Sequence, residues 1–221
     1  MAKPQYRVIH HNGDTLAVEK APGIPTTGPG SLAELVKRHY PGYLPCHRLD
    51  AMTGGVVLFA KGPAYESYLE QFRLHKMEKR YYAITKGAVK AGEYTHHLER
   101  DKRGNTLCVP NRTKFSRTAV ARFENICAGN GLALTRCLPR TGRTHQLRVQ
   151  LAALRHPILG DDRYGSREFN KLYGARYQAL WSDTLIVTGE DGERLTFYSK
   201  PVFPKRAMEA LGLTEDHFDH P

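Results

Sequence analysis

Short apolar runs separated by turn-forming residues recur along most of the chain, and their length and spacing are typical of β-strands. Residues 6–10 and 15–19 form the first two runs, and Asn12-Gly13 between them is a strong hairpin signal. Gly129-Asn130-Gly131 predicts another hairpin turn. Further strands are expected at 56–60, 79–87, 118–127, 132–138, 179–187 and 194–198, with others inside 93–127.

Helical periodicity marks four shorter segments. Ser31 and Glu34 fit a capping box that opens a helix ending near His39. The remaining helices are expected at 63–73, where an aromatic face favours core packing, after the loop that begins at 140 and before Pro157, and at 168–174.

Strands outnumber these helices and do not alternate strictly with them. The pattern therefore predicts an α+β fold with a mixed or largely antiparallel sheet, and not a doubly wound fold. A chain of 221 residues without an evident linker or repeat is expected to form a single domain over residues 1–221. The polar tail from Thr214 is expected to fray.

The net charge of the chain says more about its partners than its overall composition does. Lys and Arg number 33 against 22 acids, and the net charge of +11 favours a polyanionic partner such as nucleic acid. No stretch approaches the ~20 apolar residues of a membrane span, so we expect a cytoplasmic protein with no membrane partner. The four scattered cysteines indicate reduced thiols and no structural metal. The oligomeric state is not encoded in any visible pattern, and a monomer is the default.

One arginine interrupts the apolar face of the helix before Pro157. Leu147, Leu151 and Leu154 form the expected buried stripe of this helix, and Arg148 lies beside it. A guanidinium at the edge of a core is costly unless it meets an anion, which would be a phosphate or a carboxylate. The alternative is an arginine that extends its head group to water.

Asp50 poses the complementary problem, because it lies just before the apolar run 56–60 in the segment His47-Arg48-Leu49-Asp50. A carboxylate there needs a cation or hydrogen-bond donors to stay ionised, and Arg48 and Arg148 are the candidate cations. A turn or cap role is the alternative for Asp50. The Gly54-Gly55 pair that follows fits either a close backbone approach to a ligand or a simple turn.

The segment Thr141-Gly142-Arg143-Thr144-His145 resembles a phosphate-binding turn at a helix N-terminus. It lacks the spacing of a nucleotide P-loop, and the chain carries no nucleophile elbow and no H-E-x-x-H motif. We therefore expect no nucleotide cofactor and no catalytic metal.

Three motifs occur in order along the chain. The first is H-R-L-D-x-x-T-x-G at 47–55, the second is K-x-Y-x-A-x-x-x-G at 79–87, and the third is T-G-R-T-H-Q-L-R at 141–148, followed by H-P-I-L-G-D-x-x-Y-G at 156–165. Together they resemble the RluA-type RNA pseudouridine synthases, from Val8 to about Pro204. The resemblance implies the pseudouridine synthase fold, a bent, mixed, mostly antiparallel sheet with flanking helices and a central cleft.

The resemblance also implies a site and a reaction. Asp50 would be the catalytic carboxylate, Arg148 would pair with it, and Tyr81 would stack on the target base, with the adjacent Tyr82 as a competitor for that role. The reaction would be isomerisation of uridine in ribosomal or transfer RNA, without a cofactor, either by attack on the sugar or through a glycal. The implied substrate-binding residues are Arg48, Thr53, Arg143, His145 and Leu180.

The chain departs from the family pattern in two places. Many relatives carry a small N-terminal RNA-binding domain, but here the catalytic pattern starts near residue 6, so we expect no such domain. Leu180-Trp181-Ser182 stands where relatives often show Leu-His-Ala.

Two other functions remain open on the sequence. One is a catalytically idle RNA-binding module on the same fold. The other is a different carboxylate enzyme, a nucleoside hydrolase or glycosidase, for which Asp161-Asp162 is the remote candidate for a second acid.

Overall fold

The computed structural model describes residues 4–218 and divides into two compact units. Among the described residues, the first unit combines residues 4–79 with residues 181–202, and the second combines residues 80–180 with residues 203–218. Strands dominate both units, with a few short helices, so the predicted α+β class is confirmed. The expectation of one domain over 1–221 stays a prediction.

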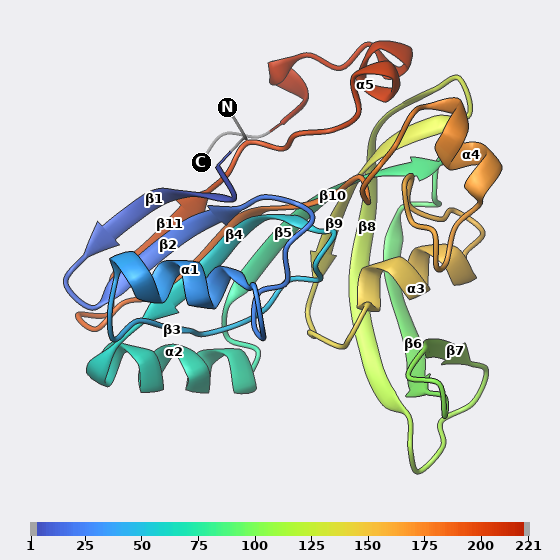
Figure 1. Ribbon diagram of the computed structural model, residues 1–221. Helices are drawn as coiled ribbons and strands as arrows, with labels where there is room; N and C mark the ends of the chain where they lie inside the picture. The colour runs from blue at the N-terminus through green and yellow to red at the C-terminus, as the bar shows by residue number, and fades with distance from the viewer. Residues whose placement is uncertain (1–3, 219–221) are drawn as a thin grey trace. The chain divides into compact units, whose positions relative to one another are not determined.

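The first unit is a mixed sheet (Figure 1). Its neighbouring strands are β1 (Tyr6–Asn12), β2 (Thr15–Lys20), β4 (Gly54–Ala60) and β10 (Leu180–Thr188). β1–β2 and β2–β4 pair antiparallel, whereas β4–β10 pair parallel. The remaining elements are β3 (Leu44–Pro45) beside β4, β11 (Arg194–Tyr198) beside β10, and the helices α1 (Leu32–His39) and α2 (Gly62–Arg73).

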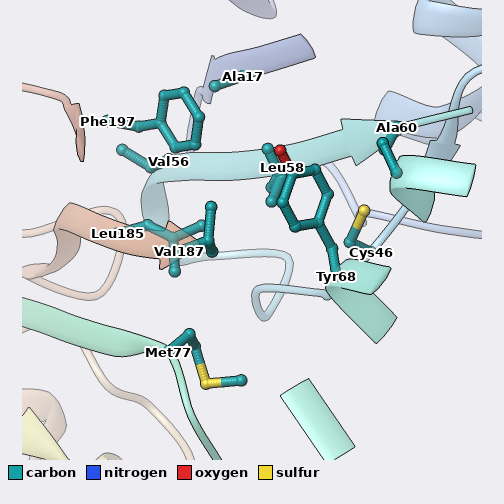
Figure 2. Packing of buried hydrophobic residues seen from close by; sticks show 11 residues of the cluster. Ala17, Cys46, Val56, Leu58, Ala60, Tyr68, Met77, Leu185, Val187 and Phe197 are labelled. Carbon is teal, nitrogen blue, oxygen red and sulfur yellow. The ribbon is translucent and has the colours of Figure 1, made fainter. Parts of the chain in front are cut away.

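The core of this unit forms around β4, whose seven residues are all buried. Figure 2 shows Tyr68 extending from α2 toward Leu58 of β4, close to Cys46. Tyr68 is 1% exposed, and its hydroxyl lies 2.9 Å from the hydroxyl of Thr15 on β2. Tyr65 and Phe72 also pack against this cluster, so the predicted core role of the aromatic helix face is confirmed.

The second unit is an antiparallel sheet in which every described pair of strands runs in opposite directions. Its order is β5 (Glu78–Lys86), β9 (Leu132–Pro139), β8 (Arg117–Gly129), β6 (Gly92–Arg100) and β7 (Thr106–Val109). Helix α3 (Gln146–Ala153) packs beside β7, and α5 (Lys205–Leu211) packs on β8 and β9. The unit also contains α4 (Arg167–Leu172) and a 3-10 turn at Glu215–His217.

The predicted hairpin turn at Asn130-Gly131 forms, whereas the predicted capping box at Ser31 and Glu34 forms only in part. Asn130 and Gly131 both have positive φ, +52° and +74°, as a tight hairpin requires. The Ser31 hydroxyl accepts the Glu34 N–H at 3.4 Å, but the Glu34 carboxylate accepts the N–H of Gly30 and not that of Ser31. The predicted capping box is therefore only half formed.

The expectation that the tail frays from Thr214 is wrong for the described part of it. Phe218 is 2% exposed and packs edge-on against Tyr82, with 5.2 Å between ring centroids. Helix α5, which was not among the elements expected from the sequence, precedes this contact. Residues 219–221, the end of the predicted tail, lie outside the described residues.

Within residues 4–218, no helix is long and apolar enough to cross a membrane. In the same range, no group of three or more His, Cys, Asp or Glu side chains is arranged to hold a metal ion. All four cysteines are free, as their scattered positions predict.

Candidate active site

Asp50 occupies the first position of a turn that leads into β4. Its backbone carbonyl accepts a hydrogen bond from the N–H of Thr53 at 3.0 Å. Asp50 is half-buried, Thr53 is buried, and Met52 at the tip of the turn is 41% exposed. This turn role uses the backbone carbonyl of Asp50, so it is compatible with a chemical role for the carboxylate.

The peptide groups on either side of this carboxylate are held by the loop that follows β2. The Thr26 hydroxyl donates to the carbonyl of Leu49 at 2.9 Å and accepts the N–H of Leu49 at 3.0 Å. The carbonyl of Ala51 accepts the N–H of Gly23 at 2.8 Å and the ammonium of Lys20 at 3.0 Å. The backbone before and after the candidate carboxylate is therefore fixed by four hydrogen bonds.

His47 anchors the start of the same segment. Its Nε2 accepts the N–H of Leu58 at 3.0 Å, and its ring stacks on Phe72 with 4.7 Å between centroids. Burial, together with the positive charge of Lys79, lowers the pKa of His47 to about 3. The imidazole is therefore neutral at pH 7 and supports the backbone, whereas the next residue, Arg48, is exposed and carries charge to the surface.

The Gly54-Gly55 pair is explained by the neighbouring strand β10. A Cβ on Gly54 would lie 2.3 Å from the ring of Trp181, and one on Gly55 would lie 2.0 Å from the carbonyl oxygen of Ser182. The Trp181 indole N–H donates to the Ser199 hydroxyl at 3.0 Å, which holds the ring in place. The close approach is therefore to a strand of the same unit, which corrects both the ligand and the simple-turn interpretations.

In the second unit, Arg148 is 6% exposed and pairs with Asp161 in a bidentate geometry. Its Nε lies 2.7 Å from Oδ2 and its Nη2 lies 3.0 Å from Oδ1 of the carboxylate. Asp161 also accepts the backbone N–H groups of Arg163 and Tyr164. The expected anion is thus the Asp161 carboxylate, and the alternative of an arginine extended to water is wrong. The pairing of Arg148 with Asp50 stays a prediction.

The two adjacent tyrosines of β5 have different environments. Tyr82 is fully buried, so its ring is not accessible to a base. Tyr81 is half-buried and packs against the cluster that contains Leu147 and Leu180. Burial therefore excludes Tyr82 as the stacking residue and leaves Tyr81, whose role stays a prediction. Leu180 is 4% exposed in the same cluster.

The turn before α3 is tied down by its own side chains. The N–H of Arg143 donates to Oε1 of Gln146 at 3.0 Å, so this backbone donor is already used within the protein. His145 adopts a left-handed conformation with φ of +54°, and its Nδ1 lies 2.9 Å from the hydroxyl of Tyr164. The turn is thus less suited to bind a phosphate through its backbone than its sequence suggests, and the side chains of Arg143 and His145 remain the candidates.

Two residues of this arrangement were not assigned their place by sequence reasoning. Asp161 lies in the H-P-I-L-G-D-x-x-Y-G run at 156–165, so that run could have identified it as a partner of Arg148. Lys20 ends a strand and is followed by Ala21-Pro22-Gly23, and nothing in this sequence pattern marks it as unusual. Only the structure shows that it is completely buried.

The chain is similar to known proteins over most of its length. The family model described as RNA pseudouridylate synthase matches residues 14–153. The dual-specificity RNA pseudouridine synthase RluA of Vibrio cholerae serotype O1 is 33% identical over 180 residues, which cover 75% of this chain and 71% of that protein. The tRNA pseudouridine synthase C of Vibrio parahaemolyticus serotype O3:K6 is 35% identical over 144 residues, 58% of each chain. The structure titled Human RNA Pseudouridylate Synthase Domain Containing 4 is similar with a TM-score of 0.76 and 26% identity, covering 94% of this chain and 93% of that chain.

The chain therefore belongs to the RNA pseudouridylate synthase family. It is an RNA pseudouridine synthase of the RluA type, an isomerase, and the predicted family and fold are confirmed.

Proposed function

We propose that this protein converts specific uridines in ribosomal or transfer RNA to pseudouridine, with Asp50 as the catalytic carboxylate. The observation that carries the proposal is the fixed backbone of Leu49 and Ala51 on either side of Asp50. A carboxylate whose position is set before the substrate arrives is suited to act as a nucleophile or a base. Asp50 also lies inside the region matched by the family model.

The isomerisation needs no redox step and no external energy. The bond from N1 of uracil to C1′ of the ribose breaks, the uracil turns, and C5 forms a new bond to C1′. The proton on C5 is lost to solvent and N1 takes up a proton, so atoms and charge balance. Asp50 would either attack C1′ or remove a proton from the sugar on a glycal route, and both routes need an ionised carboxylate at the ribose.

The other proposed residues bind and orient the RNA. Tyr81 would stack on the uracil, which must leave its helical stack to reach the carboxylate. Arg48, Arg143 and His145 would contact the phosphate backbone, to which a net charge of +11 attracts the protein. The names of the two bacterial relatives, a dual-specificity RNA pseudouridine synthase and a tRNA pseudouridine synthase, support RNA as the substrate class.

The decisive assay is release of tritium from RNA labelled at C5 of uridine, followed by nucleoside analysis of the product. The proposal predicts tritium release from a tRNA or rRNA transcript together with pseudouridine in the digest. Free uracil without pseudouridine would indicate a hydrolase. RNA binding without tritium release from cellular RNA of a strain lacking this protein would indicate an idle binding module.

A further inference from the structure

The strands β6, β7 and β8 are neighbours in the sheet with β6 in the middle, and two connecting segments lie at the end of β6 (Figure 1). The first is the turn 101–105 between β6 and β7, where Arg100 pairs with Thr106. The second is the segment 110–116, which must cross β6 because β7 and β8 pair with its opposite edges. We call these two segments, together with Arg100 and Arg117 that flank them, the β6–β8 tip.

The tip concentrates positive charge. Between residues 100 and 117 the chain has six basic residues and one acid. The basic residues are all exposed: Arg100, Lys102, Arg103, Arg112, Lys114 and Arg117. The acid, Asp101, accepts the backbone N–H groups of Arg103 and Asn105 at 2.8 Å and the side-chain amide of Asn105 at 2.9 Å, so its oxygens are used inside the turn. This surface therefore favours a polyanionic partner.

An exposed aromatic ring lies among these cations. Phe115 is 69% exposed, more than any other large apolar side chain within residues 4–218. The ammonium of Lys114 lies 5.0 Å from the centre of the ring. Single exposed apolar residues are common on protein surfaces. An exposed aromatic ring among exposed cations is a more specific combination, because it is the one that binds single-stranded nucleic acids by stacking and by phosphate contacts.

The ring is carried by a turn that its own side chains hold in place. Thr113 Oγ1 accepts the backbone N–H groups of Phe115 at 3.2 Å and Ser116 at 3.0 Å, and it donates to the carboxylate of Glu99 on β6 at 2.6 Å. The Ser116 hydroxyl accepts the N–H of Thr113 at 2.9 Å and donates to its carbonyl at 3.1 Å. A contact made from a fixed backbone costs little ordering on binding, so the position of the ring is preorganised.

The tip is continuous with a residue already proposed to contact phosphate. The Nε of Arg143 donates to the carbonyl of Thr118, the second residue of β8, at 3.1 Å. Thr118 directly follows Arg117 and lies three residues from Phe115 along the chain. A nucleic-acid strand that follows this part of β8 therefore meets Arg143 at one point and the ring of Phe115 a few residues away.

Charge also separates RNA from the other occupants of an exposed apolar site. A second copy of this chain carries the same net charge of +11 and the same basic tip, so two tips repel each other. A protein partner would need an acidic surface around an apolar one. RNA supplies both requirements in every nucleotide, a phosphate for the cations and a base that stacks on the ring.

We propose that the β6–β8 tip is a second RNA-binding element, in which the ring of Phe115 stacks on an unpaired base outside the target uridine and the surrounding cations bind the adjacent phosphates. The proposal rests on the proposed function for its substrate class, RNA. The tip contributes to the affinity for RNA and to its selection, and it takes no part in the isomerisation at the ribose. The preferred substrate is therefore an RNA in which a second unpaired base accompanies the target uridine.

The test compares three substitutions of Phe115 by filter binding to tRNA and ribosomal RNA isolated from a strain lacking this protein. Phe115→Ala should raise the dissociation constant about 5- to 100-fold, because stacking on a base is lost. Phe115→Leu keeps an apolar side chain without a ring face and should lose nearly as much affinity, whereas Phe115→Trp should bind at least as tightly as the wild type. Single-turnover tritium release at saturating enzyme should stay within about twofold in all three variants.

Control variants separate the effect of the ring from those of exposure and charge. Leu172→Ala removes an apolar side chain that is 66% exposed on α4, outside the tip, and should leave the dissociation constant within about twofold of the wild type. Arg112→Gln removes one cation of the tip and should lower the slope of log affinity against log salt by about 0.7–0.9, whereas Phe115→Ala should leave this slope unchanged. Circular dichroism checks that each variant is folded.

A dissociation constant for Phe115→Ala within about twofold of the wild type, or one that Leu172→Ala matches, overturns the proposal. Retained affinity in Phe115→Leu overturns the stacking contact. A dimer in sedimentation that dissociates in Phe115→Ala assigns the tip to a second copy of the chain and also overturns the proposal. If the wild-type protein releases no tritium, the proposed function fails, but the binding comparison still decides the role of the tip.

Discussion

Arg148 and Asp161 form a buried bidentate ion pair that joins helix α3 to the loop between α3 and α4. Their side chains are 7% and 1% exposed. Asp161→Asn would remove the negative charge that Asp161 places against the guanidinium, and the expected cost is about 3–5 kcal/mol of unfolding free energy. Urea denaturation measures this cost. The control is Glu209→Gln in the exposed pair Lys205–Glu209, for which about 0–1 kcal/mol is expected. Equal costs for the two variants would contradict a structural role for the buried pair.

Substitutions of the two neighbouring tyrosines of β5 should affect different properties, the stability of the fold for Tyr82 and the turnover of RNA for Tyr81. Tyr82→Ala empties a fully buried site, and large-to-small changes of this kind cost about 3–5 kcal/mol of stability. Tyr81→Ala should cost less stability, because this side chain is only partly buried, and should remove base stacking worth about 1–3 kcal/mol. Urea denaturation and single-turnover tritium release distinguish the two effects. Wild-type turnover by Tyr81→Ala would exclude it as the stacking residue.

The close approach of β10 to Gly55 makes a prediction about glycine substitutions. Gly55 has φ of +114°, and an added Cβ would lie 2.0 Å from the Ser182 carbonyl oxygen. Gly13 has φ of +53° with nothing within 4 Å of the added Cβ, so Gly13→Ala should cost only the left-handed penalty of about 1–2 kcal/mol. Gly55→Ala should cost several times more or prevent folding. Similar urea midpoints for the two variants would show that the strands separate easily.

His47 should make the stability of the protein depend on pH. Burial keeps its folded-state pKa near 3, whereas the unfolded chain takes up a proton near pH 6.5. Between these values the unfolded state binds more protons, so the contribution of His47 is present above about pH 6.5 and is lost as the pH falls toward 3. His47→Gln does not titrate, so its unfolding free energy should decrease less on acidification than that of the wild type. Parallel urea curves at neutral and acidic pH give this difference, and identical decreases would contradict a neutral His47 in the folded protein.

Features of the fold that depend on local chemistry could be predicted from the sequence. The β1–β2 hairpin forms around Asn12-Gly13, and α1 begins at its predicted cap Ser31, because both signals act within a few residues. Helix α5 lies outside the elements expected from the sequence, although Pro204 before it, Gly212 after it and the helix-favouring residues between them are local signals for a helix.

The candidate site was predictable only in part, because much of it depends on residues that lie apart in sequence. Asp50 and Tyr81 lie in motifs that can be read along the chain. The burial of Lys20 depends on a carbonyl 31 residues away, and the partner of Arg148 lies 13 residues further along the chain. The roles of Gly54 and Gly55 depend on Trp181 and Ser182, which a reading of the glycine motif alone does not reveal.

The central claim is that the carboxylate of Asp50 carries the chemistry, and Asp50→Asn tests it most directly. Asparagine keeps the size of the side chain and the backbone turn, but it is neither a nucleophile nor a useful base. It also removes one negative charge from a site that accepts a polyanion, so RNA binding should be unchanged or slightly tighter.

The measurement is single-turnover release of tritium from C5-labelled RNA at saturating enzyme, beside a filter-binding titration of the same RNA and a thermal melt. The account predicts a folded Asp50→Asn protein that binds RNA with near-normal affinity and releases no tritium above background. Near-normal tritium release by the folded variant would contradict it and eliminate Asp50 as the catalytic group.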